Sequence, residues 1–247
     1  MFVPLGEQRS VGCARYASPV KTVSVSEKSG AWTRSLLRCG LAAGPVFVAV
    51  FLAEGAVRKG YSPLRHPVSS LALGSRGWVQ TGNFALTGTL LLAGAAGLSR
   101  AADQTGAGQA GPVLIGAAGA GLLGSAAFVT DPVSGYPPGT PDAIEHPSRT
   151  GTIHNLSAIP VFLGLPAAAL TSGWRSWRTG QRGFGLYSAS TAVVMLATML
   201  LFSAGFGQAR GLVSLGGLFQ RISIITGFAW VGAVSVRALR RAPRRRG

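Results

Sequence analysis

The sequence predicts an all-α membrane protein, a polytopic bundle of six transmembrane helices. Hydrophobic residues make up 47% of the 247 positions and charged residues only 12%, whereas soluble domains usually carry about 25% charged residues. The charges are also uneven, because six long stretches hold almost none of them. Each stretch is close to the roughly 20 apolar residues that a helix needs to cross a bilayer core about 30 Å thick.

In order, the predicted spans cover residues 37–57, 80–98, 112–130, 153–173, 184–206 and 212–236. The first is apolar almost to its end, where Glu54 stands. The second and third contain the small-residue patterns GTLLLAG and GAAGAG. Such patterns let helix backbones approach closely in lipid, so we expect tight packing there.

The last three predicted spans differ in character. The fourth contains Pro160 and Pro166, which predict a kink because proline removes a helical hydrogen bond. The fifth has no charged residue at all. The sixth carries Gln220 and Arg221 well inside its apolar run.

The distribution of Lys and Arg predicts the orientation of the bundle. With both termini inside, 16 basic residues lie on the cytosolic side and six on the exterior side, leaving out Arg221; the positive-inside rule favours this arrangement. We therefore expect a plasma-membrane protein with cytosolic termini. Residues 1–35 are predicted to be a disordered cytosolic tail, 36–238 the six-helix domain and 239–247 a basic cytosolic tail.

The same charge distribution argues against several function classes. The net charge of +16 does not indicate a nucleic-acid partner, because the basic residues lie between apolar runs and at the ends. Cys13 and Cys39 form no metal-binding or disulfide pattern. No GxSxG, Walker A or dinucleotide-binding motif is present. We expect no cofactor, and membrane lipids as partners.

Three exterior connections are predicted to cap one end of the bundle: GYSPLRHPVSSLALG at 60–74, the segment 128–151 and the turn 207–211. Pro63 and Pro67 flank an Arg-His pair and restrict the backbone. The residues that follow predict a short interfacial helix that ends near Trp78.

Arg221 is the strongest physical signal in the sequence. Counted from the start of its span it lies roughly 15 Å deep, where an arginine costs about 2.5–3.5 kcal/mol. Glu54 and Asp131 are candidate partners. Backbone carbonyls or Asn155 are the alternative, in which case Arg221 fixes the order of the helices.

We expect the polar residues near the exterior end to form a ligand-binding pocket. The candidate residues are Arg65, His66, Asp131, His154, Arg221, Gln220 and Glu54. Arginine is suited to an anionic or lipid-like small molecule, and Asp131 is placed to accept hydrogen bonds from Arg65 or His154. One alternative is a membrane enzyme acting on a lipid head group, with His66 or His154 as general base. Another is a structural or partner-binding subunit.

His66, His154 and Asp131 are of the residue types that zinc accepts as ligands. However, the three residues come from separate segments and lack a diagnostic spacing, so we predict no metal.

Four blocks of the chain resemble the bacterial integral-membrane family known as domain of unknown function 998. The blocks are GYSPLRHPVSSLALGSRGWVQTGNFALTG (60–88), FVTDPVSGYPPGTP (128–141), IHNLSAIPVFLGLP (153–166) and GLFQRISIITGFAW (217–230). The resemblance covers roughly residues 38–240 and implies about six membrane helices, but no activity. Its matching positions are Arg65, His66, Pro67, Ser69, Trp78, Asn83, Asp131, Pro132, His154, Gln220 and Arg221. Asn155 departs from the family pattern, which often has an aspartate or glycine there.

Overall fold

The computed structural model describes residues 25–105 and 108–241, and within them the chain is helical with no strand. The α-helices are α1 (Val25–Val57), α2 (Gly77–Thr105), α3 (Ala110–Ala127), α4 (Arg149–Ile159), α5 (Leu165–Arg178), α6 (Arg182–Phe206) and α7 (Gly216–Arg241). Two short 3-10 helices, η1 (Val68–Ala72) and η3 (Val213–Leu215), and one π-helical turn, η2 (Pro160–Gly164), complete the described elements. The predicted all-α class is confirmed.

Within residues 25–105 and 108–241, six helical segments are long and apolar enough to cross a membrane, which agrees with the predicted number of spans. They are Gly30–Val57, Gly77–Ala102, Ala110–Ala127, Arg149–Arg178, Arg182–Phe206 and Val213–Arg241. Most of the predicted tail, residues 1–24, lies outside the described residues, and the chain is helical from Val25 onward. At the other end α7 continues to Arg241, and residues 242–247 are likewise outside the described part.

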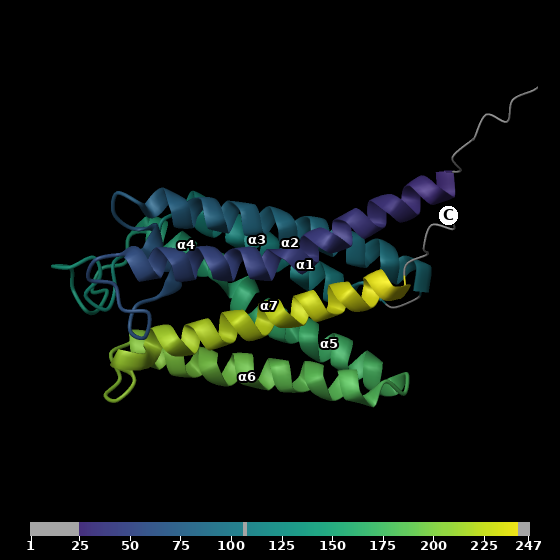
Figure 1. Cartoon of the computed structure of the whole chain (residues 1–247). Coiled ribbons are helices and arrows are strands. Elements are labelled where there is room, and N and C mark those ends of the chain that lie inside the picture. Colours follow the sequence, from purple (N-terminus) through teal and green to yellow (C-terminus); the bar gives the residue numbers. More distant parts are fainter. Residues whose placement is uncertain (1–24, 106–107, 242–247) are drawn as a thin grey trace, which may run out of the picture.

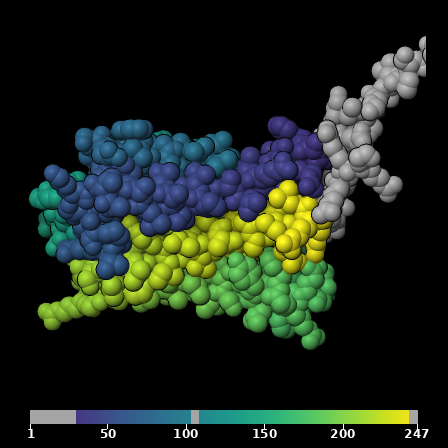
Figure 2. Space-filling view, viewed as in Figure 1, coloured from purple at the N-terminus to yellow at the C-terminus, as the bar shows by residue number. Residues whose placement is uncertain are grey.

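The helices form a closed ring in which each span packs against its neighbours in sequence. α1 packs on α2, α2 on α3, α5 on α6 and α6 on α7, while α7 returns to α1. α3 contacts α5 and η2, which closes the ring on the other side. Figure 1 shows the helices lying side by side, and Figure 2 shows α1, α7 and α6 filling one face without interruption.

The two ends of the bundle differ. The start of α1 and the end of α7 lie together at one end, here called the terminal end (Figure 1, right). The connections 58–76, 128–148 and 207–215 gather at the opposite end, here called the loop end. The predicted grouping of these three connections is thus observed.

Small residues form the closest helix crossings, as the patterns in the second and third spans predict. A Cβ on Gly94 of α2 would lie 2.5 Å from Cα of Gly40 on α1. A Cβ on Gly88 would lie 2.7 Å from the carbonyl oxygen of Gly119 on α3. Because the backbones touch at these points, only glycine fits without moving a helix.

The fourth span bends where the prolines predict. α4 and α5 are joined by η2, a π-helical turn that begins at Pro160, and Pro166 follows in the first turn of α5. Pro160 has no N–H to donate, so the regular helical ladder is interrupted there. On either side of this bend, α4 packs against α3 and α5 packs against α6.

One predicted element is wrong in its extent. The interfacial helix expected to end near Trp78 is only the five-residue η1, and the chain then turns at Gly74, which has a φ of +76°. Trp78 belongs to the first turn of α2 and is 74% exposed. The glycine breaks the helical pattern, because its left-handed backbone suits a turn.

Exposed tryptophans mark both ends of the apolar belt. Trp78 lies at the loop end, while Trp32, Trp174 and Trp177 lie at the terminal end, all more than half exposed. Tryptophan is enriched at the two membrane–water interfaces. This distribution agrees with a bundle that crosses a bilayer along its long axis.

We predict that Gly94→Ala destabilises the bundle, because the new methyl group overlaps the α1 backbone at Gly40. Overpacking of this kind costs roughly 1–3 kcal/mol. Gly82→Ala is the matched control in the same helix, since a Cβ there meets nothing within 4 Å. Thermal unfolding in detergent should show a lower Tm for Gly94→Ala and an unchanged or higher Tm for Gly82→Ala; equal values would contradict the close crossing.

Candidate functional site

Arg221 lies near the start of the last helix, toward the loop end. The chain before α7 forms a turn and η3, so the α-helix begins at Gly216. Arg221 is five residues further, about 7.5 Å along the axis. Its side chain is nevertheless buried, with 6% exposure.

The Arg221 guanidinium is bound by backbone carbonyls of the 60–67 connection. Its Nη1 donates to the oxygens of Pro63 at 2.5 Å and His66 at 3.1 Å, and also to that of Gly217 in the first turn of α7 at 2.9 Å. Its Nη2 donates to the Tyr61 hydroxyl at 2.5 Å. The predicted partners Glu54 and Asp131 are therefore wrong, and the carbonyl alternative is what the structure shows.

The same connection satisfies the start of α7. The amides of Gly217 and Leu218 donate to the carbonyls of Arg65 and Leu64, at 3.1 and 2.9 Å. These are two of the donors that a helix N-terminus leaves without intrahelical partners. The Gln220 side-chain oxygen in turn accepts from the Val68 amide at 2.8 Å. We call this assembly of residues 61–68 with 216–221 the clasp.

Glu54 serves a second set of contacts at the loop end. It forms ion pairs with Arg58, one helical turn on at 3.1 Å, and with Arg76 just before α2. Arg58 also donates to the carbonyls of Leu71 and Leu73, at 2.6 and 2.8 Å. Glu54 is thus paired with the arginines of the connection that follows it, which places it outside any ligand set built around Arg221.

Two aspartates at the loop end hold loops together. Arg65 pairs with Asp142 at 2.6 Å, and Gln208 donates to the Asp142 carbonyl at 2.8 Å. Asp131 accepts from the Ser148 amide at 2.9 Å, next to the start of α4. The hypothesis that Asp131 accepts from Arg65 or His154 is wrong, because the turn before α4 brings a backbone donor to it instead.

The two buried histidines have separate surroundings. His66 packs between Tyr61 and Tyr136, with ring centroids 5.4 and 5.2 Å away, and its Nδ1 accepts from the Ser62 amide. Burial, assisted by the nearby Arg65 charge, lowers the pKa of His66 below its ordinary value of 6.5. This imidazole is therefore neutral at pH 7.

His154 lies on α4 and faces a different set of groups. Its Nδ1 is 2.8 Å from the Phe128 carbonyl, and its ring packs edge-on against Phe84. A carbonyl only accepts, so Nδ1 carries the proton and Nε2 is the nitrogen left to accept in the neutral ring. Among the described residues no three His, Cys, Asp or Glu side chains group as a metal site.

A cavity of about 330 Å³ opens at the loop end beside His154; we call it the loop-end cavity. All six spans contribute to its walls. Most lining residues are apolar, and the polar ones are Ser69, Ser125, His154, Asn155, Ser203 and Gln220. Of the seven predicted site residues, only His154 and Gln220 line this cavity.

The loop-end cavity has uncharged walls, and its exposed lining residues are Asn155, Ile159, Leu163 and Ser203. No acidic or basic side chain other than His154 is among its described lining residues. Ile159 and Leu163 line it and are each 46% exposed, so the cavity opens to the side of the bundle beside η2. The oxygen of the Gln220 amide is used in the clasp, whereas its nitrogen makes no hydrogen bond within the described chain.

Sequence reasoning missed most of these walls. Phe47, Phe84 and Phe202 are ordinary apolar residues of three separate spans, and nothing in their spacing indicates a shared cavity. Pro160 is the one residue whose pattern points toward the cavity. It begins the π-helical turn that supplies Val161, Phe162 and Leu163 to the walls.

We predict that Arg221→Leu destabilises the protein far more than Arg210→Leu, whose side chain is exposed. The leucine leaves three carbonyls and a hydroxyl without their donor, and each hydrogen bond to a charged group contributes about 1.5–3 kcal/mol. Thermal unfolding and the yield of folded protein in detergent measure the difference. Equal Tm values for the two variants would show that the clasp is not required for stability.

The comparisons with known proteins identify a family but no activity. The family model described as "Protein of unknown function (DUF998)" matches residues 41–237. Neither a curated protein nor a solved structure matches the chain. The matched region includes all of the clasp and the whole loop-end cavity. The chain therefore belongs to the DUF998 family, and the six apolar helices among its described residues are those of a multi-pass membrane protein.

Proposed function

We propose that this multi-pass membrane protein binds a lipid-like amphiphile in the loop-end cavity. The observation that carries the proposal is a cavity with uncharged, mainly apolar walls that opens sideways past Ile159 and Leu163. Its volume of about 330 Å³ is within the range of small-molecule sites. A side opening at membrane depth admits a ligand from the lipid phase.

The polar groups lie on the loop-end side of the cavity, where the head of a bound amphiphile would rest. His154 and Asn155 lie in the middle of α4, which begins at the loop end, and Gln220 lies near the start of α7, so all three are on the loop-end side of the cavity. Phe162, Met199 and Ile224 line the deeper part. A head that both donates and accepts hydrogen bonds, carried on an apolar tail, fits this gradient.

A strongly anionic ligand at this end has less support. The charges of Arg65 and Arg221 are already engaged, with Asp142 and with the clasp carbonyls. Neither side chain lines the cavity. The enzyme alternative has one observation in its favour, the acceptor nitrogen of His154, but His66 does not share the cavity.

We also propose that the loop end faces away from the cytosol in the plasma membrane. The cytosolic placement of both termini rests on the excess of Lys and Arg at the terminal end. The same orientation puts the clasp and the mouth of the cavity in the outer half of the bilayer.

Filling the cavity should remove the ligand. We predict that Ser203→Trp, on the α6 wall, lowers the amount of co-purified lipid detected by native mass spectrometry at least fivefold. Leu200→Trp is the control, since Leu200 is on the same helix, is 67% exposed and does not line the cavity. Wild-type protein that carries no lipid at near-stoichiometric level, or equal loss in both variants, would reject the proposal.

Thiol labelling in intact cells tests the orientation. With Cys13 and Cys39 replaced by serine, we expect Ala143→Cys, exposed in the loop-end connection, to react with a membrane-impermeant maleimide. Thr179→Cys, exposed between α5 and α6, should react only after the cells are permeabilised. The reverse pattern would place the termini outside.

A further inference from the structure

A second and larger cavity lies at the terminal end, and its chemistry is the opposite of the first. It has a volume of about 460 Å³ and is lined by residues of α2, α3, α5 and α7 together with Gln181. Three arginines, Arg175, Arg237 and Arg241, are among the described lining residues, and no acidic side chain is. We call it the terminal-end cavity.

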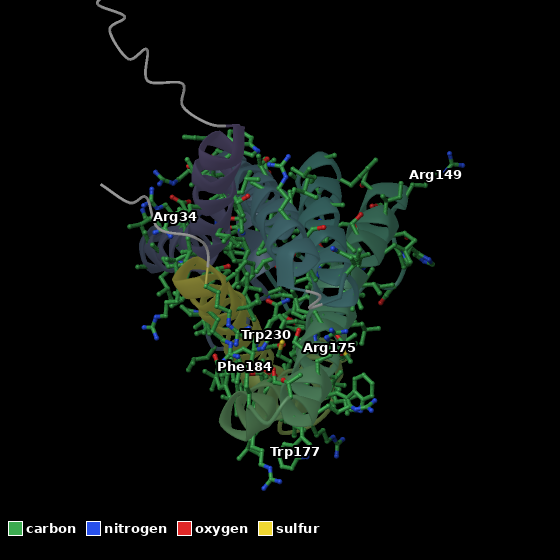
Figure 3. The ribbon with its side chains drawn as sticks, turned by 90° about the vertical axis from the view of Figure 1, so that its right-hand side faces the viewer. Arg34, Arg149, Arg175, Trp177, Phe184 and Trp230 are labelled. Atoms are coloured by element: carbon green, nitrogen blue, oxygen red, sulfur yellow. The ribbon has the colours of Figure 1, made fainter. Side chains whose placement is uncertain are left out.

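Two helices supply the three arginines: Arg175 comes from α5, and Arg237 and Arg241 come from α7, one turn apart. Figure 3 views the bundle from the terminal end, with Arg175 of α5 and Phe184 of α6 both near its centre, whereas Trp177 and Arg149 lie at the periphery. Arg237 stacks on Phe184, with 3.8 Å from its guanidinium carbon to the ring centroid. This stacking fixes the plane of the Arg237 guanidinium.

Arg237 and Arg241 share a single neutral partner. Both donate from Nη2 to the side-chain oxygen of Gln181, Arg241 at 2.8 Å. The two positive groups are thus within two hydrogen-bond lengths of each other. A neutral amide does not compensate either charge, and the ion pairs between described residues, which involve Arg58, Arg65 and Arg76, are all at the loop end.

Stabilisation of helix ends alone does not explain this arrangement. Cations in the last turn of a helix interact well with its dipole, and such positions are held by Arg175 and Arg178 on α5 and by Arg240 and Arg241 on α7. Arg178 and Arg240 are exposed and do not line the cavity, and Arg178 instead lies over the Trp174 ring. Arg237 is only partly exposed and points with Arg241 at one oxygen.

We propose that the terminal-end cavity binds a phosphate-bearing anion between Arg237 and Arg241. A phosphate accepts bidentate hydrogen bonds from guanidinium groups and removes the repulsion between them. Basic pockets between membrane helices are suited to anionic lipid head groups, and Trp174 and Trp177 place this end at the interface. The phosphate belongs either to such a head group or to a soluble phosphate compound.

The test is a binding titration of the full chain in detergent, read by native mass spectrometry. The probes are phosphatidylglycerol and phosphatidylcholine of equal chain length, and inorganic phosphate as a competitor. We expect one phosphatidylglycerol bound at least tenfold more tightly than phosphatidylcholine, and a tenfold or greater loss in Arg237→Gln/Arg241→Gln. Arg240→Gln, the matched control, should stay within twofold of the wild type.

Each further result decides a point. Full competition by millimolar inorganic phosphate assigns the site to a soluble phosphate, and its failure to compete assigns the site to the lipid head group; both support the cavity. Equal binding of the two lipids without phosphate binding overturns the proposal, as does an equal loss in Arg240→Gln. If the double variant does not fold, the single change Arg241→Gln, at an exposed side chain, replaces it.

Discussion

The loop end depends on the hydrogen bonds that Arg221 donates to the backbone of the 60–67 connection. A non-helical segment packed against membrane helices exposes carbonyls that water does not reach, and each needs a donor. The rigid guanidinium donates to the Pro63 and His66 carbonyls and the Tyr61 hydroxyl of this segment, and also to the Gly217 carbonyl in the first turn of α7. The ammonium group of a lysine has no such planar fork.

The clasp links two segments that are about 150 residues apart in sequence. The α7 amides of Gly217 and Leu218 need acceptors and the connection needs donors, so each satisfies the other. Gly217 is required at the contact, because a Cβ there would lie 2.5 Å from the His66 carbonyl oxygen. By fixing Val68 against Gln220, the clasp also sets one wall of the loop-end cavity.

The sequence predicts those features that depend on neighbouring residues and not those that depend on contacts between distant segments. Hydropathy over about 20 residues is a local property, so the six spans were predicted. The partners of Arg221 and Glu54 depend on how connections fold back, which local pattern does not contain. The sixth span begins within one residue of its predicted start, but the apolar pattern LVSLGG does not reveal that its first residues form the 3-10 turn η3 instead of an α-helix. In the sequence, Arg175, Arg237 and Arg241 indicate only the orientation of the bundle, because nothing in their spacing shows that they line one cavity.

The ability of an arginine in this bundle to bind a ligand is decided by its partner rather than by its depth. Arg221 is the most deeply buried of the arginines discussed, yet its donors are largely used by the fold. Arg237 and Arg241 lie at the rim but share one neutral oxygen, so much of their hydrogen-bonding capacity and all of their charge remain available. Position in the sequence alone would instead favour Arg221 over Arg237 and Arg241 as a ligand-binding residue. The cavity at the loop end is uncharged because the arginines near it are engaged in contacts within the fold. The cavity at the terminal end is cationic because Arg237 and Arg241 have only a neutral partner.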